Sequence, residues 1–346
     1  MINRLVIKER AVDLNHSPLV IPEIGINHEG DINKAIQMID DACLAGAEIV
    51  KFQSHIVEDE MSSAAKKVIP GNADVSIYDI MARCALTKDE EMEIKRYVEQ
   101  KGMLFLSTPF SRAAANHLEE LGVDAYKIGS GECNNYPLIE HISSFGKPMI
   151  LSTGMNNIES IKPAVEILER ANVQYALLHC TSMYPTPYNK VNLGAIEDLK
   201  RNFPNAVLGL SDHSLHNYTC YGAIPLGASI VEKHFTSNKS WDGPDIPISI
   251  DPQELKELIE GTEAIWKALG GTKEILPEEQ VTIDFAYSTV VSIAPIKKGD
   301  KFTMDNIWVK RPGTGEIKAA DFKNLLGKEA AHNISLDTQL QWSMLK

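Results

Sequence analysis

Two lysines set in apolar runs, together with a series of hydroxyl residues, indicate a site for an anion. Lys51 in EIVKFQ and Lys127 in AYKIGSGE would each bury an ammonium group if the side chain turned inward. Burying that charge costs free energy unless an anion meets it, and an ion pair with a neighbouring glutamate is the alternative. Gly129, Gly131 and Gly154 would let backbone N–H groups approach the same ligand. The hydroxyl groups that could donate hydrogen bonds to a phosphate or a carboxylate belong to Thr108, Ser130, Ser152, Ser182 and Ser211.

Two histidines are the candidates for a metal site. His213 and His234 each follow an apolar run, AVLGLSD and SIVEK, so both rings could meet in one place. Nitrogen and oxygen donors suit a borderline divalent cation, Mn²⁺ in the first place, with Mg²⁺ or Co²⁺ as alternatives. Either histidine alone would usually be a surface or satisfied core residue, but together with Glu23 at the end of LVIPE they favour a metal. The pattern leaves the roles of His28 and His55 open.

Carboxylates and one arginine complete the candidate set. Glu132 and Glu232 follow apolar runs and suit acid/base work or the orientation of sugar hydroxyls, although Glu232 could equally pair with Lys51 or support a metal-bound histidine. Asp245 in GPD could bind a polyol or only cap a turn. Arg311 is followed by Pro-Gly, a turn that could present the guanidinium group to another site.

Eight apolar runs must position these residues. They alternate with helical patterns, which predicts parallel βαβ units and an α/β fold of the (β/α)8-barrel class, with the chemistry at the carboxyl ends of the strands. Thr87 and Glu90 form a capping-box pattern ahead of a helix that runs through Gln100. Other helices are expected near 32–43, 111–121, 137–144, 157–171, 191–202, 214–226 and 252–269. The long segment 55–86 is expected to cover the substrate. The runs are LVIPEI, EIVKFQ, MLFLST, AYKIGSGE, PMILST, YALLHCTSMY, AVLGLSDH and SIVEKHF.

The chain is longer than one barrel requires. A typical barrel has about 250 residues, and this chain has 346. We expect a catalytic barrel over 1–269, a linker over 270–282 with Gly, Pro and charged residues, and a small β-rich domain over 283–346. Such a domain is marginal alone by surface-to-volume scaling, so it is expected to pack on another surface.

Composition excludes several partners. The net charge of −13 disfavours nucleic acid and anionic membranes, which reward an excess of Lys and Arg. No run approaches the roughly 20 apolar residues of a membrane span, and MINRLVIKER lacks the apolar core of a secretion signal. The five cysteines show no CxxC spacing, which is typical of reduced thiols in a cytoplasmic protein. We therefore expect a soluble, cytoplasmic protein.

Ten stretches across the chain carry a family resemblance. They are PEIGINHEG, VKFQ, LSTPF, YKIGSGE, LSTGM, LHCTSMYPTP, GLSDHS, VEKHFT, GPD and VKRPG. In this order they resemble the N-acetylneuraminate (sialic acid) synthase family, and the last part of the chain is similar to the antifreeze-like (SAF) domain of that family. The resemblance implies condensation of phosphoenolpyruvate with N-acetylmannosamine and water to give N-acetylneuraminate and phosphate. The aldehyde would be activated by a metal, and the C–O bond of phosphoenolpyruvate would break.

The resemblance also implies roles for individual residues. The metal falls to His213 and His234. Glu23 is matched to the acceptor aldehyde, to its activating metal water, or to both. Lys51, Glu132 and Glu232 are catalytic candidates from their positions in the sequence. Phosphoenolpyruvate falls to Lys51, Thr108, Lys127, Ser130, Ser152, Ser182 and Ser211, and the acceptor sugar to Gln53, Asn72, Glu132, Tyr184 and Asp245. Arg311 would reach the acetamido group in a partner subunit, which implies a domain-swapped homodimer.

Two departures from the family pattern concern the substrates. Ser182 stands where Asn is expected, and Trp241 and Asp242 are bulkier and more acidic than expected. The stretches HIVEDEM, VIPGN and GECNNYPL favour the subgroup that makes N-acetylneuraminate itself. The alternative is a legionaminic or pseudaminic acid synthase that uses a diacetamido-trideoxyhexose. More distant rivals are a Schiff-base aldolase acting through Lys51 or Lys127 and a non-catalytic sugar-acid binder on the same fold.

Overall fold

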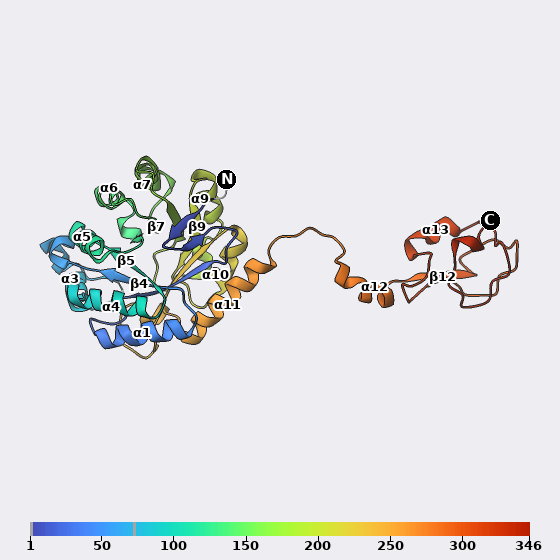
Figure 1. Ribbon diagram of the computed structural model, residues 1–346, viewed down its shortest axis with the longest axis horizontal. Helices are drawn as coiled ribbons and strands as arrows, with labels where there is room; N and C mark the ends of the chain where they lie inside the picture. Colours follow the sequence, from blue (N-terminus) through green and yellow to red (C-terminus); the bar gives the residue numbers. More distant parts are fainter. Residues whose placement is uncertain (1–2, 72–73) are drawn as a thin grey trace. The chain divides into compact units, whose positions relative to one another are not determined.

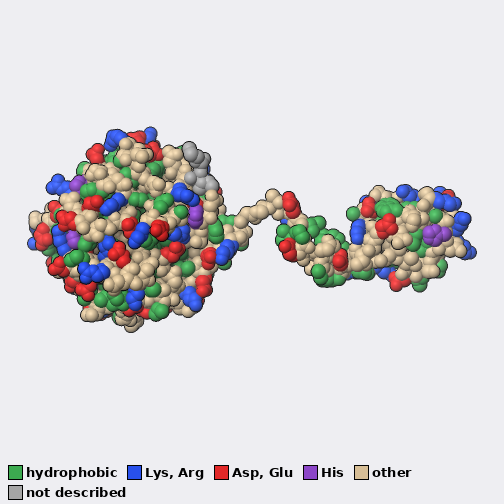
Figure 2. Space-filling model, in the orientation of Figure 1, with side chains coloured by type: hydrophobic (Ala, Val, Ile, Leu, Met, Phe, Trp, Pro, Cys, Tyr) green, Lys and Arg blue, Asp and Glu red, His purple; other side chains and the backbone are tan. Residues whose placement is uncertain are grey.

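A computed structural model describes residues 3–71 and 74–346. The chain forms two compact units, Met1–Gly270 and Gly271–Lys346. Each unit is described by itself below. Among the described residues, no helix is long and apolar enough to cross a membrane. On the face of the first unit that Figure 2 presents, basic and acidic side chains are interspersed.

The first unit is built on one parallel sheet of eight strands, surrounded by helices (Figure 1). The strand order is β5-β4-β3-β10-β9-β8-β7-β6, and β5 and β6, at the two ends of this order, lie side by side. The sheet therefore curls into a nearly closed barrel, which confirms the predicted fold class. The strands are β3 (Leu19–Gly25), β4 (Ile49–Ser54), β5 (Leu104–Pro109), β6 (Tyr126–Ile128), β7 (Met149–Ser152), β8 (Tyr175–Cys180), β9 (Val207–Asp212) and β10 (Ile230–His234).

Helices cover the outside of the sheet, most of them where the apolar periodicity predicts them. The capping box of Thr87 and Glu90 is present at the start of α4, with backbone and side-chain bonds in both directions. The covering helices are α1 (Ile32–Leu44), α4 (Lys88–Gln100), α5 (Arg112–Leu121), α6 (Tyr136–Ser143), α7 (Ile158–Arg170), α9 (Ala195–Asn202), α10 (Tyr218–Ala223) and α11 (Pro252–Ala268).

Three segments differ from the predicted pattern. The helix expected over 191–202 is divided into α8 (Tyr188–Val191) and α9, because Asn192 adopts a left-handed conformation with φ of 53°. The helix expected from 214 begins only at Tyr218 and ends in the 3₁₀ turn η3 (Ile224–Leu226). The segment 55–86 contains α2 (Val57–Glu60), the 3₁₀ turn η1 (Ser63–Lys67) and α3 (Ile77–Cys84).

An N-terminal hairpin closes the amino end of the barrel. Its strands, β1 (Leu5–Ile7) and β2 (Arg10–Val12), are antiparallel. Leu5, Ile7 and Val12 are buried against residues near the amino ends of the barrel strands, including Leu19 and Ile49. Each such buried side chain stabilises the fold by about 1.5–3 kcal/mol. The interior is therefore apolar at this end, which leaves polar residues for the opposite end.

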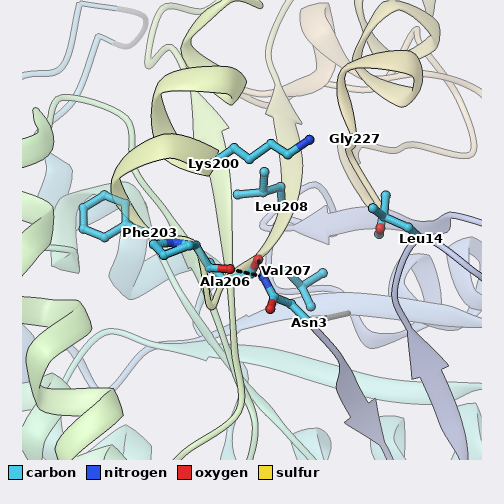
Figure 3. Close-up of a pocket in the computed structure, with 10 residues that line it drawn as sticks. Asn3, Leu14, Lys200, Phe203, Ala206, Val207, Leu208 and Gly227 are labelled. Atoms are coloured by element: carbon cyan, nitrogen blue, oxygen red, sulfur yellow. Dashed lines mark hydrogen bonds between the residues drawn. The ribbon is translucent and has the colours of Figure 1, made fainter. Parts of the chain in front are cut away.

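A hollow of about 340 Å³ lies outside the barrel near the amino end of β9. Figure 3 shows Phe203, Leu208 and Leu14 around it, with the amide of Asn3 donating to the carbonyl oxygen of Ala206 at 2.9 Å. Its lining is mainly apolar. The residues predicted to do chemistry lie at the other ends of the strands, so this hollow is not the predicted site.

The second unit has a small antiparallel sheet and its own core. Strand β11 (Thr289–Ser292) pairs with β12 (Ile307–Lys310). A 3₁₀ turn, η5 (Pro277–Glu279), and the helix α12 (Gln280–Ala286) precede the sheet, and the short α13 (Phe322–Leu325) follows it. The core consists of Val290, Ile296, Phe302, Ile307, Ile317, Leu325, Ala330, Ile334 and Leu340.

Candidate active site

Strand alternation brings most of the predicted residues into the open mouth of the barrel. Successive side chains of a strand point to opposite faces, so Glu232 and His234 of β10 point inward and Lys233 points outward. The register pairs Glu232 with Ser211 of β9 and His234 with Glu23 of β3. The predicted residues therefore converge from several strands at the carboxyl end of the sheet.

Lys51 meets a carboxylate in the floor of this mouth. Its Nζ lies 2.6 Å from Glu23 Oε2 and 3.8 Å from Glu232 Oε1, and it donates to Thr108 Oγ1 at 3.3 Å. All three charged side chains are nearly fully buried, at 3–7% exposure. The ion-pair alternative therefore describes Lys51 in this structure.

Lys127 is less completely compensated. Its Nζ donates to Ser152 Oγ at 2.7 Å and to the carbonyl oxygen of Ile128 at 3.0 Å, while Glu232 Oε1 lies 3.7 Å away. Burial lowers the pKa of Lys127, and Glu232 opposes this only in part. For Lys51, burial is outweighed by Glu23 and Glu232, which raise its pKa. An incoming anion would therefore be stabilised by Lys127 in particular.

The two glutamates have pKa values displaced in opposite directions. Burial, opposed by Lys51, holds the pKa of Glu23 above its ordinary value. Burial also acts on Glu232, but there Lys127 and Lys51 outweigh it and lower the pKa. Two nearby carboxyl groups whose pKa values are pushed apart are suited to separate acid and base roles.

Hydroxyl groups form a cradle beside the lysines. Ser130 Oγ accepts from the backbone N–H of Gly154 at 3.0 Å, and Ser211 Oγ donates to Glu232 Oε1 at 3.0 Å. A Cβ atom on Gly154 would collide with Ser182 Oγ and would lie 2.8 Å from Ser130 Oγ. Only glycine lets the backbone lie this close to both hydroxyl groups, so Ser130 and Ser182 come together beside Gly154.

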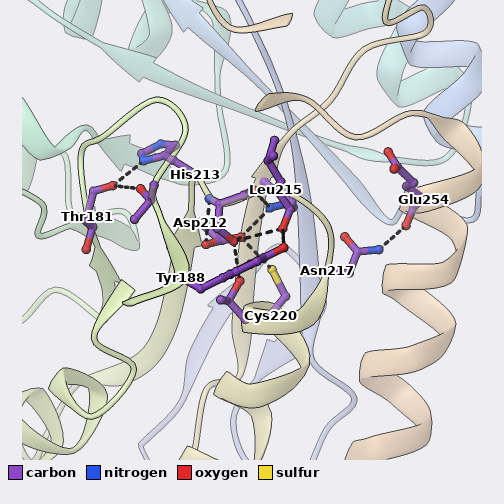
Figure 4. A network of polar contacts seen from close by, with 12 residues as sticks. Thr181, Tyr188, Asp212, His213, Leu215, Asn217, Cys220 and Glu254 are labelled. Atoms are coloured by element: carbon purple, nitrogen blue, oxygen red, sulfur yellow. Dashed lines mark hydrogen bonds and ion pairs between the residues drawn. The ribbon is translucent and has the colours of Figure 1, made fainter. Parts of the chain in front are cut away.

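The two histidines lie together at the rim. Their ring centroids are 5.4 Å apart, and the ring of Tyr184 lies 4.2 Å from that of His213. His213 Nδ1 lies 3.0 Å from the carbonyl oxygen of Thr181, which leaves its Nε2 for a ligand. Figure 4 shows this contact. The rings therefore converge as predicted.

The histidine pair fits a divalent cation. Among the described residues, His234 Nδ1 is a buried nitrogen without a hydrogen-bond partner, and its nearest acidic atom is Asp245 Oδ2 at 3.7 Å. Such orphaned atoms are rare and call for an explanation. Burial keeps the pKa of His234 well below its ordinary value, so the ring stays in the neutral form that binds metal. Within the described ranges no cluster of three or more His, Cys, Asp or Glu side chains is arranged for a metal, so the protein itself would supply two nitrogen ligands.

The residues assigned to the acceptor sugar are only partly brought together. Gln53 Nε2 donates to Glu23 Oε1 at 2.9 Å, and burial raises the pKa of Asp245 to about 6. Glu132, on the 3₁₀ turn after β6, accepts from Asn135 at 2.5 Å. Asn72 lies outside the described residues. Arg311 is an exposed residue of the second unit.

A buried ion pair behind the histidines was not predicted from the sequence. Lys233 Nζ lies 2.5 Å from Asp212 Oδ2 and donates to the carbonyl oxygen of Ser214 at 2.6 Å. Ser214 Oγ donates to the same carboxylate at 2.9 Å, and Cys220 Sγ approaches it at 3.7 Å (Figure 4). The pair thus ties together the strand ends that carry His213 and His234. Its only signal in the sequence is the charged residue between two inward residues in LSDH and VEKH.

The fold and the site together define an enzyme of the (β/α)8-barrel class with a small additional domain. A model described as the NeuB family matches residues 38–274, and one described as the SAF domain matches residues 288–346. The chain belongs to the NeuB family, and the predicted SAF domain is confirmed.

Several relatives of this family match over nearly the whole chain. The N,N'-diacetyllegionaminic acid synthase of Campylobacter jejuni is 39% identical and covers 92% of this chain and 97% of its own length. The human N-acetylneuraminate-9-phosphate synthase is 33% identical and covers 95% and 92%. The crystal structure of an N-acetylneuraminic acid synthetase from Leptospira borgpetersenii matches with a TM-score of 0.74 at 33% identity, covering 82% of this chain and 96% of that one. Relatives named for different sugars are thus similar to this chain to a comparable degree.

Proposed function

We propose that this protein condenses phosphoenolpyruvate with N-acetylmannosamine and water, forming N-acetylneuraminate and inorganic phosphate. The observation that carries the proposal is the convergence of Lys127, Lys51 and the hydroxyl cradle beside the paired rings of His213 and His234. A cationic cradle suits the phosphate and carboxylate of phosphoenolpyruvate. The adjacent rim suits a polyhydroxy aldehyde.

Binding of the phosphate would redistribute charge in the floor. Lys51 now pairs with Glu23 at 2.6 Å, and an arriving phosphate dianion would draw the ammonium group away. Burial already raises the pKa of Glu23. Loss of the Lys51 ammonium group as a partner would therefore protonate the Glu23 carboxyl group. Glu23 would then be a general acid beside the acceptor aldehyde.

In the proposed reaction, C3 of phosphoenolpyruvate attacks the aldehyde carbon with the electron pair of its enol double bond. The aldehyde oxygen takes the proton from Glu23 as the new C–C bond forms. Water then adds to the resulting cationic C2, and Glu232, whose pKa is lowered by the two lysines, accepts the proton that this water releases. The tetrahedral intermediate expels phosphate by C–O cleavage as its new hydroxyl group passes its proton to the departing phosphate, whose charge is held by Lys127 and the hydroxyl groups.

A divalent cation completes the proposal. His213 and His234 would hold it, and Mn²⁺ suits the donors best, with Mg²⁺ and Co²⁺ as alternatives. When bound, such an ion polarises a carbonyl oxygen of the substrate. We further propose a domain-swapped homodimer in the cytoplasm, in which Arg311 reaches the acetamido group in the partner's site. The family resemblance and the exposure of Arg311 support this arrangement.

The second candidate is a legionaminic acid synthase that uses a diacetamido-trideoxyhexose, or the corresponding pseudaminic acid synthase. It is supported by the 39% identity with the Campylobacter jejuni enzyme. The lowered pKa of the buried Lys127 also supports a third candidate function, a Schiff-base aldolase.

Phosphate release tests the function. The enzyme is given phosphoenolpyruvate with N-acetylmannosamine or a 2,4-diacetamido-trideoxyhexose, before and after EDTA, and then with added Mn²⁺, Mg²⁺ or Co²⁺. We expect release with N-acetylmannosamine that EDTA abolishes and Mn²⁺ restores. Preference for the diacetamido sugar would support the second candidate, and covalent trapping by borohydride with pyruvate would support the aldolase. Phosphate release with none of these acceptors would overturn the proposal.

A further inference from the structure

A chain of side-chain contacts runs from helix α2 to the floor of the site. Glu60 Oε2 lies 2.8 Å from His55 Nδ1, and His55 Nε2 lies 3.0 Å from Gln53 Oε1. Gln53 Nε2 donates to Glu23 Oε1 at 2.9 Å, and Glu23 Oε2 lies 2.6 Å from Lys51 Nζ. The chain therefore connects the segment after β4 with the buried ion pair.

The pairing of Glu23 with Lys51 determines how the Gln53 amide is oriented. Glu23 is a carboxylate that accepts, so the amide nitrogen of Gln53 must face it and the amide oxygen must face His55. Both nitrogens of His55 then meet acceptors, Gln53 Oε1 and the Glu60 carboxylate.

The surroundings hold this ring in place. His55 is 5% exposed and stacks on Phe110, with ring centroids 4.6 Å apart and planes 12° apart. If the amide of Gln53 were reversed, its oxygen would face an oxygen of the Glu23 carboxylate. That contact would be repulsive, so His55, held by Glu60 and Phe110, supports the amide in the orientation that donates to Glu23.

We propose that His55 and Glu60 are positioning residues for the acceptor side of the site. They fix the orientation of the Gln53 amide and, through it, the carboxylate of Glu23. This inference rests on the proposed function, in which Gln53 and Glu23 face the acceptor sugar and Lys51 and Lys127 face phosphoenolpyruvate. Loss of these side-chain contacts would therefore weaken the use of the acceptor sugar and leave the use of phosphoenolpyruvate nearly unchanged.

The short helix α2 offers a set of matched variants. Glu60→Ala removes the partner of His55, whereas Glu60→Gln keeps a side chain that can donate to Nδ1 while Nε2–H still faces Gln53. Asp59→Ala removes the neighbouring carboxylate, which accepts from the backbone N–H of Ala113 at 2.8 Å and anchors α2 without joining the chain. Glu58→Ala removes an exposed charge from the same turn.

Steady-state kinetics of phosphate release test the proposal. We expect Glu60→Ala to raise the KM for the acceptor sugar about tenfold or more, in line with the loss of an outer-shell partner. The KM for phosphoenolpyruvate should change less than twofold. In Glu60→Gln the KM for the acceptor sugar should return most of the way to the wild-type value. His55→Phe, which keeps the stack on Phe110, should behave like Glu60→Ala, and the double variant should be no worse than either single one. Equal effects on both KM values, or the same effect in Asp59→Ala, would indicate loosening of the loop and would overturn the proposal.

Crystal structures of the wild type, Glu60→Gln and Glu60→Ala provide a readout that does not depend on activity. In Glu60→Ala the Gln53 amide should leave the position 2.9 Å from Glu23, while Glu60→Gln should retain it. An unchanged Gln53 in Glu60→Ala would overturn the positioning role, whatever reaction the enzyme catalyses. Movement of Gln53 in an enzyme that releases no phosphate would instead count against the proposed function alone.

Discussion

Replacing Lys233 by methionine measures how strongly the buried ion pair holds the strand ends that carry the two histidines. The side chains of Lys233 and Asp212 are 0% and 1% exposed, so water cannot compensate a charge that loses its partner. Methionine fills most of the space of the lysine stem but leaves the carboxylate of Asp212 unpaired. Removing one member of such a pair costs about 3–5 kcal/mol. At about 2 °C per kcal/mol for a unit of this length, the Tm of the barrel unit should fall by roughly 6–10 °C.

Urea and thermal unfolding, followed by circular dichroism, provide the measurement. The double variant Asp212→Asn/Lys233→Met removes both charges and should be more stable than the sum of the single losses by at least about 1 kcal/mol. Lys256→Met is the matched control, because Lys256 is 54% exposed and lies 3.8 Å from Glu260 on α11. Exposed pairs contribute about 0–1 kcal/mol. If Lys233→Met unfolded within 1 kcal/mol of the wild type, the reasoning about the buried pair would be refuted.

Three further predictions concern the site and its surroundings. Lys51→Ala and His234→Ala should each lower turnover more than tenfold in the phosphate-release assay, and near-wild-type rates in both would contradict the site assignment. Gly154→Ala should raise the KM for phosphoenolpyruvate about tenfold, because the added Cβ would lie 2.8 Å from the Ser130 hydroxyl group; an unchanged KM would rule out a phosphate pocket there. Burial lowers the pKa of His28 to about 4 from an ordinary 6.5, so its contribution to stability is present above pH 6.5 and is lost as the pH falls toward 4. Between pH 7 and 5 the free energy of unfolding should fall about 2 kcal/mol more in the wild type than in His28→Gln, as measured by urea midpoints.

The barrel and many residues of its open end could be predicted because the alternation of strands with helices is visible in the sequence. Apolar runs that end in polar residues placed Glu232 and His234 near the end of one strand and Lys51 on another. This pattern of apolar runs did not predict the contacts of a charged side chain that points outward from the barrel. In a sequence, Lys233 looks like a solvent-exposed residue, and only the register that sets it opposite Asp212 reveals a buried pair.

Contacts between segments also escaped prediction. His55 could not be assigned because its partners, Glu60 and the ring of Phe110, come from different elements, and their approach depends on how α2 folds back. The division of the helix at Asn192 depends on one left-handed residue, which apolar periodicity does not detect. The ion pair of Lys51 with Glu23 was an open alternative, because strand ends alone do not tell which carboxylate lies nearest.

The hairpin that plugs the amino end of the barrel has a kinetic consequence. Within residues 3–71 and 74–346, Leu5, Ile7 and Val12 close the amino end, so we expect reactants and products to pass through the carboxyl end of the sheet. The lysines lie at its bottom and are nearly inaccessible, whereas Tyr184 at the entrance is 43% exposed. An acceptor bound at the entrance would block the exit of any molecule bound below it. We therefore expect the substrates to bind, and the products to leave, in a fixed order. Under the proposed function, the enolpyruvyl ester would enter before the sugar, and the sugar acid would leave before inorganic phosphate.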